Sequence, residues 1–231
     1  MTERPSKKMR TDARFSPFQS KTVILSVGPA GARFTVHRDF LYMASPYFLE
    51  RLDSGYLSHD IMILPEAESP TIENFLNWLY SRRIEDSSTS LSLSFLEIEK
   101  LWVFAYNYRI TTLMDKTVNA WHERFSDHLE SSLRSCSIEW NSLYVYENTE
   151  KDSKLRKLRV EILAHLTPDH KWDTEDGNVA AEPEQLRRDL LYRKSHAQYR
   201  LPHPGARKGR LKSLNLCQFH EHGSGEPCST K

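Results

Sequence analysis

The apolar and polar positions between residues 33 and 64 predict a strand, two short helices and a second strand in close succession. Residues 33–36 alternate apolar and polar side chains, which is typical of a half-buried strand, and the apolar spacing becomes helical over residues 37–44. Ser45-Pro46 ends one helix and begins the next, because proline disfavours the α conformation in the residue before it yet fits the first helical turn. The unbroken apolar run Ile61–Leu64 is typical of a strand covered on both faces.

The same patterns predict the elements around this stretch. Residues 21–27 form a strand that turns at Gly28–Gly31 and pairs back antiparallel with residues 33–36. A helix begins near Ser69, with an apolar stripe made of Ile72, Phe75, Leu76 and Leu79. A helical hairpin follows over residues 95–125, with its break near residues 107–110. We expect its aromatic residues to belong to the core.

Helical patterns continue beyond residue 125. They predict helices over residues 125–146 and 153–166, the second with Ser153 as its N-cap, and an amphipathic basic helix over residues 183–196. Residues 187–212 then carry nine lysines and arginines against the single acid Asp189. Such a segment is either a solvated linker or a contact for phosphates or an acidic partner, and the first interpretation is favoured.

The composition is that of a globular chain with polar extensions. The chain has 231 residues, 39% hydrophobic and 27% charged, a net charge of +1 and a mean hydropathy of −0.62. We expect one domain with tails, and neither the charge nor any apolar run points to nucleic acid or membrane. The first residues lack the apolar centre of a secretion signal, so we expect an intracellular protein of the cytoplasm or nucleus.

Four short motifs resemble the BTB/POZ domain, in the version common in fungal proteins. They are the stretches His37–Leu41, Ser45–Phe48, Ile63–Glu66 and Phe75–Tyr80. The resemblance runs from about Lys21 to Trp121, and weaker likeness to the fungal proteins continues to about Leu166. It implies an α+β BTB/POZ fold, a small mixed sheet flanked by helical hairpins, with an α-helical C-terminal extension.

These observations divide the chain into four segments. We expect a disordered basic tail over residues 1–19 and a BTB/POZ domain over residues 20–125. A helical extension follows over residues 126–167. Residues 168–231 form a largely loose basic tail that contains a Cys/His segment at residues 217–228.

The resemblance also implies what the domain does. BTB/POZ domains form two-fold homodimers through the first helix and an edge strand, and they offer a helical face to cullin-type ubiquitin ligases or transcriptional co-regulators. The candidates for the dimer interface are therefore Phe40, Leu41, Tyr42 and Ala44. Their side chains occupy more of the helix circumference than is needed for one face to pack on the core. The alternative is that they belong to the core of the monomer, which we favour for Leu41 and Ala44.

The partner-binding candidates are Arg38, Tyr56 and Leu57. The chain departs from the family at two places near them. It has Thr22 where many members open the first strand with Asp. Where many cullin adaptors carry a hydrophobic-x-Glu segment, it has either Tyr56-Leu57-Ser58 or Leu57-Ser58-His59, without the carboxylate. Both departures weaken the expectation of a specific partner without removing it.

The Cys/His segment holds the residues best suited to chemistry. Cys217, His220, His222 and Cys228 supply two thiolates and two imidazoles, the ligand set of a tetrahedral zinc ion. Their spacing, C-x2-H-x-H-x5-C, is not a common finger spacing, so an unstructured His-rich tail is the alternative. A zinc ion with all four positions filled by protein would be structural. Similar segments recur near the ends of the fungal proteins that the chain resembles.

The sequence argues against an enzyme. It contains no nucleophile elbow, no zinc-protease motif and no glycine-rich phosphate loop, and it has only eight glycines. The resemblance to the BTB/POZ domain implies instead a homodimeric protein–protein interaction module, with a role as substrate adaptor for a cullin-type ubiquitin ligase. The alternative is a nuclear, transcription-related regulator whose basic tail and Cys/His segment contact nucleic acid.

Overall fold

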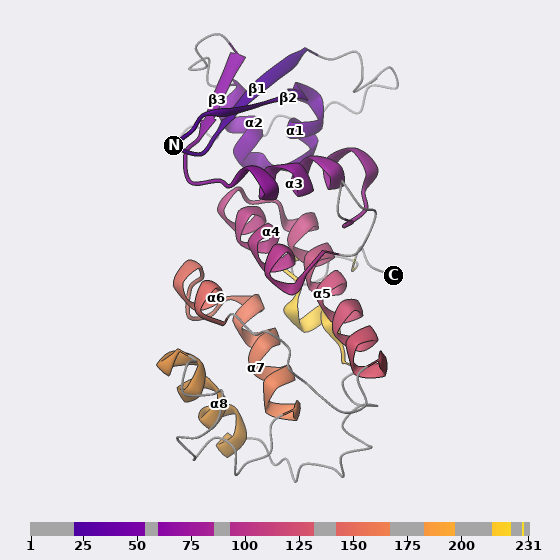
Figure 1. Ribbon diagram of the computed structural model, residues 1–231, viewed down its shortest axis with the longest axis vertical. Coiled ribbons are helices and arrows are strands. Elements are labelled where there is room, and N and C mark those ends of the chain that lie inside the picture. Colours follow the sequence, from indigo (N-terminus) through magenta and orange to yellow (C-terminus); the bar gives the residue numbers. More distant parts are fainter. Residues whose placement is uncertain are drawn as a thin grey trace, which may run out of the picture. The chain divides into compact units, whose positions relative to one another are not determined.

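The computed structural model describes residues 21–53, 60–85, 93–131, 142–166, 183–196, 214–222 and 228. The chain divides into two compact units, Met1–Glu66 and Ala67–Lys231, and each is described by itself. Figure 1 shows the strands in the first unit and helices throughout the second.

The first unit contains a small mixed sheet. β1 (Thr22–Val27) and β2 (Ala32–His37) form the expected antiparallel hairpin, and β3 (Ile61–Leu64) pairs parallel with β1, so that the strand order is β2-β1-β3. Gly28 and Gly31 in the hairpin turn have φ angles of +66° and +65°, which glycine adopts without strain. Among the described strands, β2 and β3 are therefore the outer two.

Two short helices complete the described part of this unit: α1 (Arg38–Ala44) and α2 (Pro46–Asp53). Ser45 separates them as expected, because its N–H donates to the carbonyl of Leu41 at 3.3 Å and its hydroxyl accepts from the N–H of Tyr47 at 3.0 Å. Phe48 and Leu52 are the buried side chains of α2.

The structure corrects one expectation for β3. The run Ile61–Leu64 was predicted to be covered on both faces, yet Ile63 is 68% exposed while Met62 and Leu64 are buried. The reason is that side chains of a strand alternate between the two faces of the sheet, and Ile63 lies on the face opposite to Met62 and Leu64. An unbroken apolar run does not show which of its residues faces solvent.

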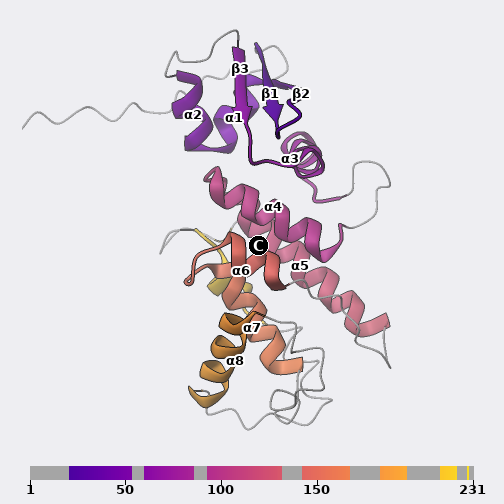
Figure 2. The same ribbon diagram turned by 60° about the vertical axis from the view of Figure 1, so that its left-hand side comes forward.

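The second unit is helical in its described part. Its elements are α3 (Ser69–Ser81), α4 (Phe95–Asn107), α5 (Thr111–Ser131), α6 (Ser142–Asn148), α7 (Lys154–Leu166), α8 (Glu184–His196) and the short 3-10 helix η4 (Leu216–Phe219). Helices α4 and α5 pack along each other, and α8 packs on α7 (Figure 2).

The α4–α5 hairpin supplies the core of the second unit. Helix α4 begins with a capping box in which Ser94 and Glu97 bond each other's backbone N–H groups. Trp102, Trp121 and Phe125 are fully buried, which confirms that these aromatic residues belong to the core, whereas Phe95, Tyr106 and Tyr108 are half-buried. A buried ion pair between Glu99 on α4 and Arg159 on α7 joins the hairpin to the later helices.

The helices after residue 125 differ in part from those expected. The predicted helix over residues 125–146 does not begin at residue 125, because Phe125 lies within α5, which runs to Ser131; α6 begins at Ser142, and residues 132–141 lie outside the described residues. Ser153 caps α7 as predicted, because its hydroxyl accepts from the N–H of Arg156 at 3.2 Å. The four-segment division of the chain stays a prediction, and its residues 1–19 lie outside the described residues.

None of the described helices combines the length and the apolar character needed to cross a membrane.

Candidate metal centre

The turn of η4 brings the first two candidate ligands together. The side chain of Asn215 accepts from the N–H of Cys217 at 3.2 Å, and the N–H of His220 donates to the carbonyl of Cys217 at 3.3 Å. Phe219, between them, is 5% exposed. The segment is therefore fixed by its own backbone and by one buried aromatic side chain.

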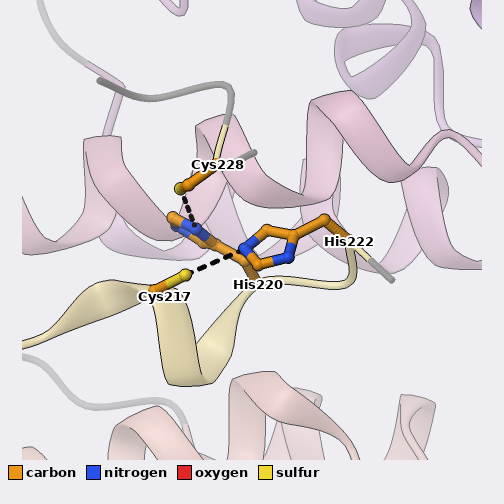
Figure 3. Close-up of side chains that lie close together, drawn as sticks. All are labelled: Cys217, His220, His222 and Cys228. Atoms are coloured by element: carbon orange, nitrogen blue, oxygen red, sulfur yellow. Dashed lines mark hydrogen bonds between the residues drawn. The ribbon is translucent and has the colours of Figure 1, made fainter. Parts of the chain in front are cut away.

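All four predicted ligands lie together (Figure 3). The ligand atoms of Cys217, His220, His222 and Cys228 are within 4.8 Å of one another. Cys217 Sγ is 3.0 Å from His222 Nε2, and Cys228 Sγ is 3.2 Å from His220 Nδ1. Neither cysteine is in a disulfide.

The two histidines approach the centre through different ring nitrogens. His220 presents Nδ1 and His222 presents Nε2, and the two rings are edge to face with centroids 5.6 Å apart. Because Nδ1 lies closer to the backbone than Nε2, this choice lets two histidines with one residue between them face one point. The uncommon spacing of the segment is therefore compatible with a shared ion.

The geometry suits a tetrahedral metal ion. A zinc ion with Zn–S bonds of about 2.3 Å and Zn–N bonds of about 2.0–2.1 Å holds its ligand atoms roughly 3.3–3.8 Å apart. The two sulfur–nitrogen distances, 3.0 and 3.2 Å, lie just below that range. The limit of 4.8 Å, within which all four ligand atoms lie of one another, is above it. Two thiolates and two imidazoles fill all four positions, so such a site stabilises structure and does not activate water.

Helix α5 contacts the centre from outside the ligand set. His220 is 3% exposed, and its Nε2 lies 2.9 Å from Oδ1 of Asn119. One helical turn earlier, Oδ1 of Asp115 accepts from the N–H of Glu221 at 2.7 Å. The centre is therefore held against α5 by two separate hydrogen bonds.

The electrostatic surroundings favour the form of histidine that binds metals. Burial, above all, lowers the pKa of His220, although the Asp115 carboxylate acts in the opposite direction. The neutral imidazole is the ligand form. Burial also raises the pKa of Glu221, which Lys154 opposes. Lys154, on α7, donates to the carbonyl of Gln218 at 3.0 Å.

The candidates for the dimer interface lie on α1 with different exposures. Phe40 is 7% exposed and Leu41 is fully buried, whereas Tyr42 and Ala44 are half-buried. Met43, which the sequence analysis did not single out, is 52% exposed. Their part in an interface stays a prediction.

Arg38 is engaged within the first unit. Its guanidinium donates to the hydroxyl of Tyr42 at 2.7 Å and to the carbonyl of Leu52 at 2.6 Å. The Tyr42 hydroxyl in turn donates to Asp53, and burial followed by this bond raises the pKa of Tyr42. Arg38 therefore connects α1 with α2. Tyr56 and Leu57 lie outside the described residues, and partner binding by all three stays a prediction.

Sequence reasoning missed the residues of α5 that contact the centre. Asp115 and Asn119 are four positions apart on a helix whose neighbouring side chains are largely buried. Polar side chains at this spacing share one helix face, which was the only available signal. It did not indicate that the Cys/His segment was their partner.

Comparison with known proteins agrees with the fold. Residues 15–124 match the family model of the BTB/POZ domain. No curated protein is similar enough to the chain to count as a match. The mixed sheet and the helices described above fit the α+β architecture of that domain. Residues 15–124 thus match in sequence, and their described part fits in fold, the BTB/POZ domain, a type of domain that mediates protein–protein interaction.

Proposed function

We propose that the protein is a self-associating BTB/POZ interaction module of the fungal type, whose C-terminal Cys/His segment is held by a structural zinc ion. The match of residues 15–124 to the BTB/POZ family carries the first part of this proposal. In this role the protein presents partners and catalyses no reaction of its own.

Exposed apolar side chains in the first unit support self-association. Met43 on α1, Leu49 on α2 and Ile63 on β3 are 52%, 43% and 68% exposed. Burying such side chains against a second copy contributes roughly 25 cal/mol for each Å² removed from water. The proposed interface thus includes Met43 beside the half-buried Tyr42 and Ala44.

Sedimentation velocity tests the dimer. We expect the wild-type protein to be dimeric at tens of micromolar and Met43→Glu to be monomeric. Leu191→Glu is the matched control, because Leu191 is 56% exposed but lies on α8 of the second unit. A wild-type protein that remains monomeric over this range would contradict self-association.

The Cys2His2 cluster is the observation that supports the proposed zinc site. We expect elemental analysis of protein purified without chelators to find about one zinc ion per chain. Cys217→Ser and Cys228→Ser should lose it. Cys136→Ser is the control, because Cys136 is the one remaining cysteine of the chain and is not a proposed ligand. Equal zinc content in all four proteins would refute this site.

The proposed partner is a cullin-type ubiquitin ligase, with a transcriptional co-regulator as the other candidate. Direct titration of the protein with a purified cullin tests this, and Tyr56→Ala with Leu57→Ala should weaken binding at least tenfold. A cullin that does not bind the wild-type protein would exclude the adaptor role and leave the co-regulator.

A further inference from the structure

Two polar residues of α5 contact consecutive residues of the Cys/His segment. Asn119 Oδ1 lies 2.9 Å from Nε2 of His220, and Asp115 Oδ1 accepts from the N–H of Glu221 at 2.7 Å. Residues four apart lie on one face of a helix. One contact is to a ligand side chain and the other is to the backbone between the two histidine ligands.

The contact with Asn119 determines which nitrogen of His220 can bind a metal. An amide oxygen is an acceptor only, so Nε2 of His220 must carry the proton that it donates. In a neutral imidazole the other nitrogen then has the free lone pair. That nitrogen, Nδ1, is the one that faces Cys228 Sγ at 3.2 Å. The ring is therefore already in the tautomer and orientation that the cluster requires.

The contact with Asp115 acts on the backbone. Asp115 is 3% exposed, and it holds the N–H of Glu221 while His220 and His222 project toward the centre on either side. Hydrogen-bonded groups around metal ligands commonly contribute tenfold to a hundredfold in metal affinity by fixing ligand orientation.

We propose that Asn119 is a positioning residue of the metal centre and that it selects Nδ1 of His220 as the ligand atom. Because Asn119 lies on α5, metal binding then also holds the Cys/His segment against α5. This rests on the zinc site proposed above. Asn119 and His220 are 101 positions apart in the chain. The metal centre is thus completed by a helix of the second unit, and α5 is part of it without supplying a ligand.

The test compares three substitutions in the full-length chain. Asn119→Leu removes the acceptor, and Asn119→Asp keeps an oxygen there that can accept from Nε2–H. Asn77→Leu is the matched control, because Asn77 is also half-buried and donates one hydrogen bond, to the carbonyl of Glu85 at 2.8 Å, on α3. Zinc affinity is measured by competition with a chelating dye, and cobalt absorption reports the ligand set.

We expect Asn119→Leu to bind zinc roughly 10- to 100-fold more weakly than the wild type, with the stoichiometry unchanged. Asn119→Asp and Asn77→Leu should stay within about threefold of the wild type. Nitrogen-15 NMR of the zinc-loaded wild type should show His220 metallated at Nδ1 and protonated at Nε2. The NMR measurement needs no variant, so it decides the question even if Asn119→Leu fails to fold.

Three results would overturn the inference. Zinc affinity of Asn119→Leu equal to that of Asn77→Leu would show that Asn119 has no positioning role. Metallation of His220 at Nε2 would show that the ring is turned the other way. A wild-type protein that binds no zinc would overturn the proposed metal site together with this inference, whereas the first two results would leave that site standing.

Discussion

Glu99 on α4 and Arg159 on α7 form an ion pair inside the core of the second unit, with Arg159 Nη1 2.8 Å from Glu99 Oε1. The side chains are only 3% and 1% exposed. The same carboxylate oxygen accepts from the indole N–H of Trp121 on α5 at 3.1 Å. One buried carboxylate therefore connects three helices, α4, α5 and α7.

Removing one member of this pair should strongly destabilise the second unit. We expect Glu99→Leu or Arg159→Leu to lower its free energy of unfolding by about 3–5 kcal/mol, because either change leaves a buried charge without its partner. The double substitution should cost less than either single one. Denaturation followed by tryptophan fluorescence measures this, since all five tryptophans lie in the second unit.

The exposed pair Lys157–Asp152 provides the control for that prediction. Its side chains are 51% and 93% exposed, and its N–O distance is 3.8 Å. Water screens such a pair, so Asp152→Ala should leave the denaturation midpoint nearly unchanged. Comparable losses from the buried and the exposed pair would contradict the role given to Glu99 and Arg159.

Removal of the proposed zinc ion should release the Cys/His segment from α5. The segment is small, and metal binding supplies folding free energy that a short segment without a core of its own lacks. We expect chelation to increase hydrogen exchange in peptides that include Phe219 and His220, and to leave β1 and β2 of the first unit unaffected. Mass spectrometry of the full chain with and without chelator measures the change. Unchanged exchange around Phe219 would mean that hydrogen bonds alone hold the segment.

Alkaline pH should destabilise the second unit through Tyr144. Burial, above all, raises the pKa of Tyr144 from 10.0 to about 12. The folded protein therefore holds this proton more tightly than the unfolded chain does. The corresponding stabilisation is fully present below pH 10 and is lost as the pH rises from 10 toward 12. Thermal denaturation at several pH values should show a shallower alkaline loss in Tyr144→Phe, and equal slopes in both proteins would refute this assignment.

Neighbouring residues of β3 should respond to substitution in opposite ways. Ile63 is 68% exposed and Met62 is 3% exposed. We expect Ile63→Lys to leave the stability of the first unit unchanged within about 0.5 kcal/mol and to weaken self-association. Met62→Lys should unfold the unit, because it buries an unpaired charge. Circular dichroism measures the stability of each variant, and sedimentation velocity measures its self-association. Loss of structure in Ile63→Lys would show that this side chain belongs to the core.

Local patterns in the sequence were enough to predict most elements of the first unit. Ser45-Pro46 marks the boundary between two helices because its effect is confined to neighbouring residues. The four residues of the Cys2His2 cluster were predictable from residue type alone, because thiolates and imidazoles are the groups that zinc prefers. The exposure of Ile63 was not, because an apolar run without alternation does not show whether one face of the strand is left uncovered.

The contacts of Asn119 and Asp115 could not be predicted for a different reason. They join residues 101 and 106 positions apart, and no local period or spacing encodes such a pairing. Only the three-dimensional arrangement of α5 and η4 reveals it. The sequence thus indicates which residues can bind an ion, while the fold determines which side chains orient them.

The one-residue spacing of His220 and His222 has a consequence for how the chain tolerates change. His220 reaches the centre through Nδ1 and His222 through Nε2, so each ring meets its own sulfur neighbour across a single intervening residue. One residue added between the two histidines should therefore turn one imidazole away from its cysteine. Insertions at this point are expected to be far less tolerated than substitutions of the residue between them.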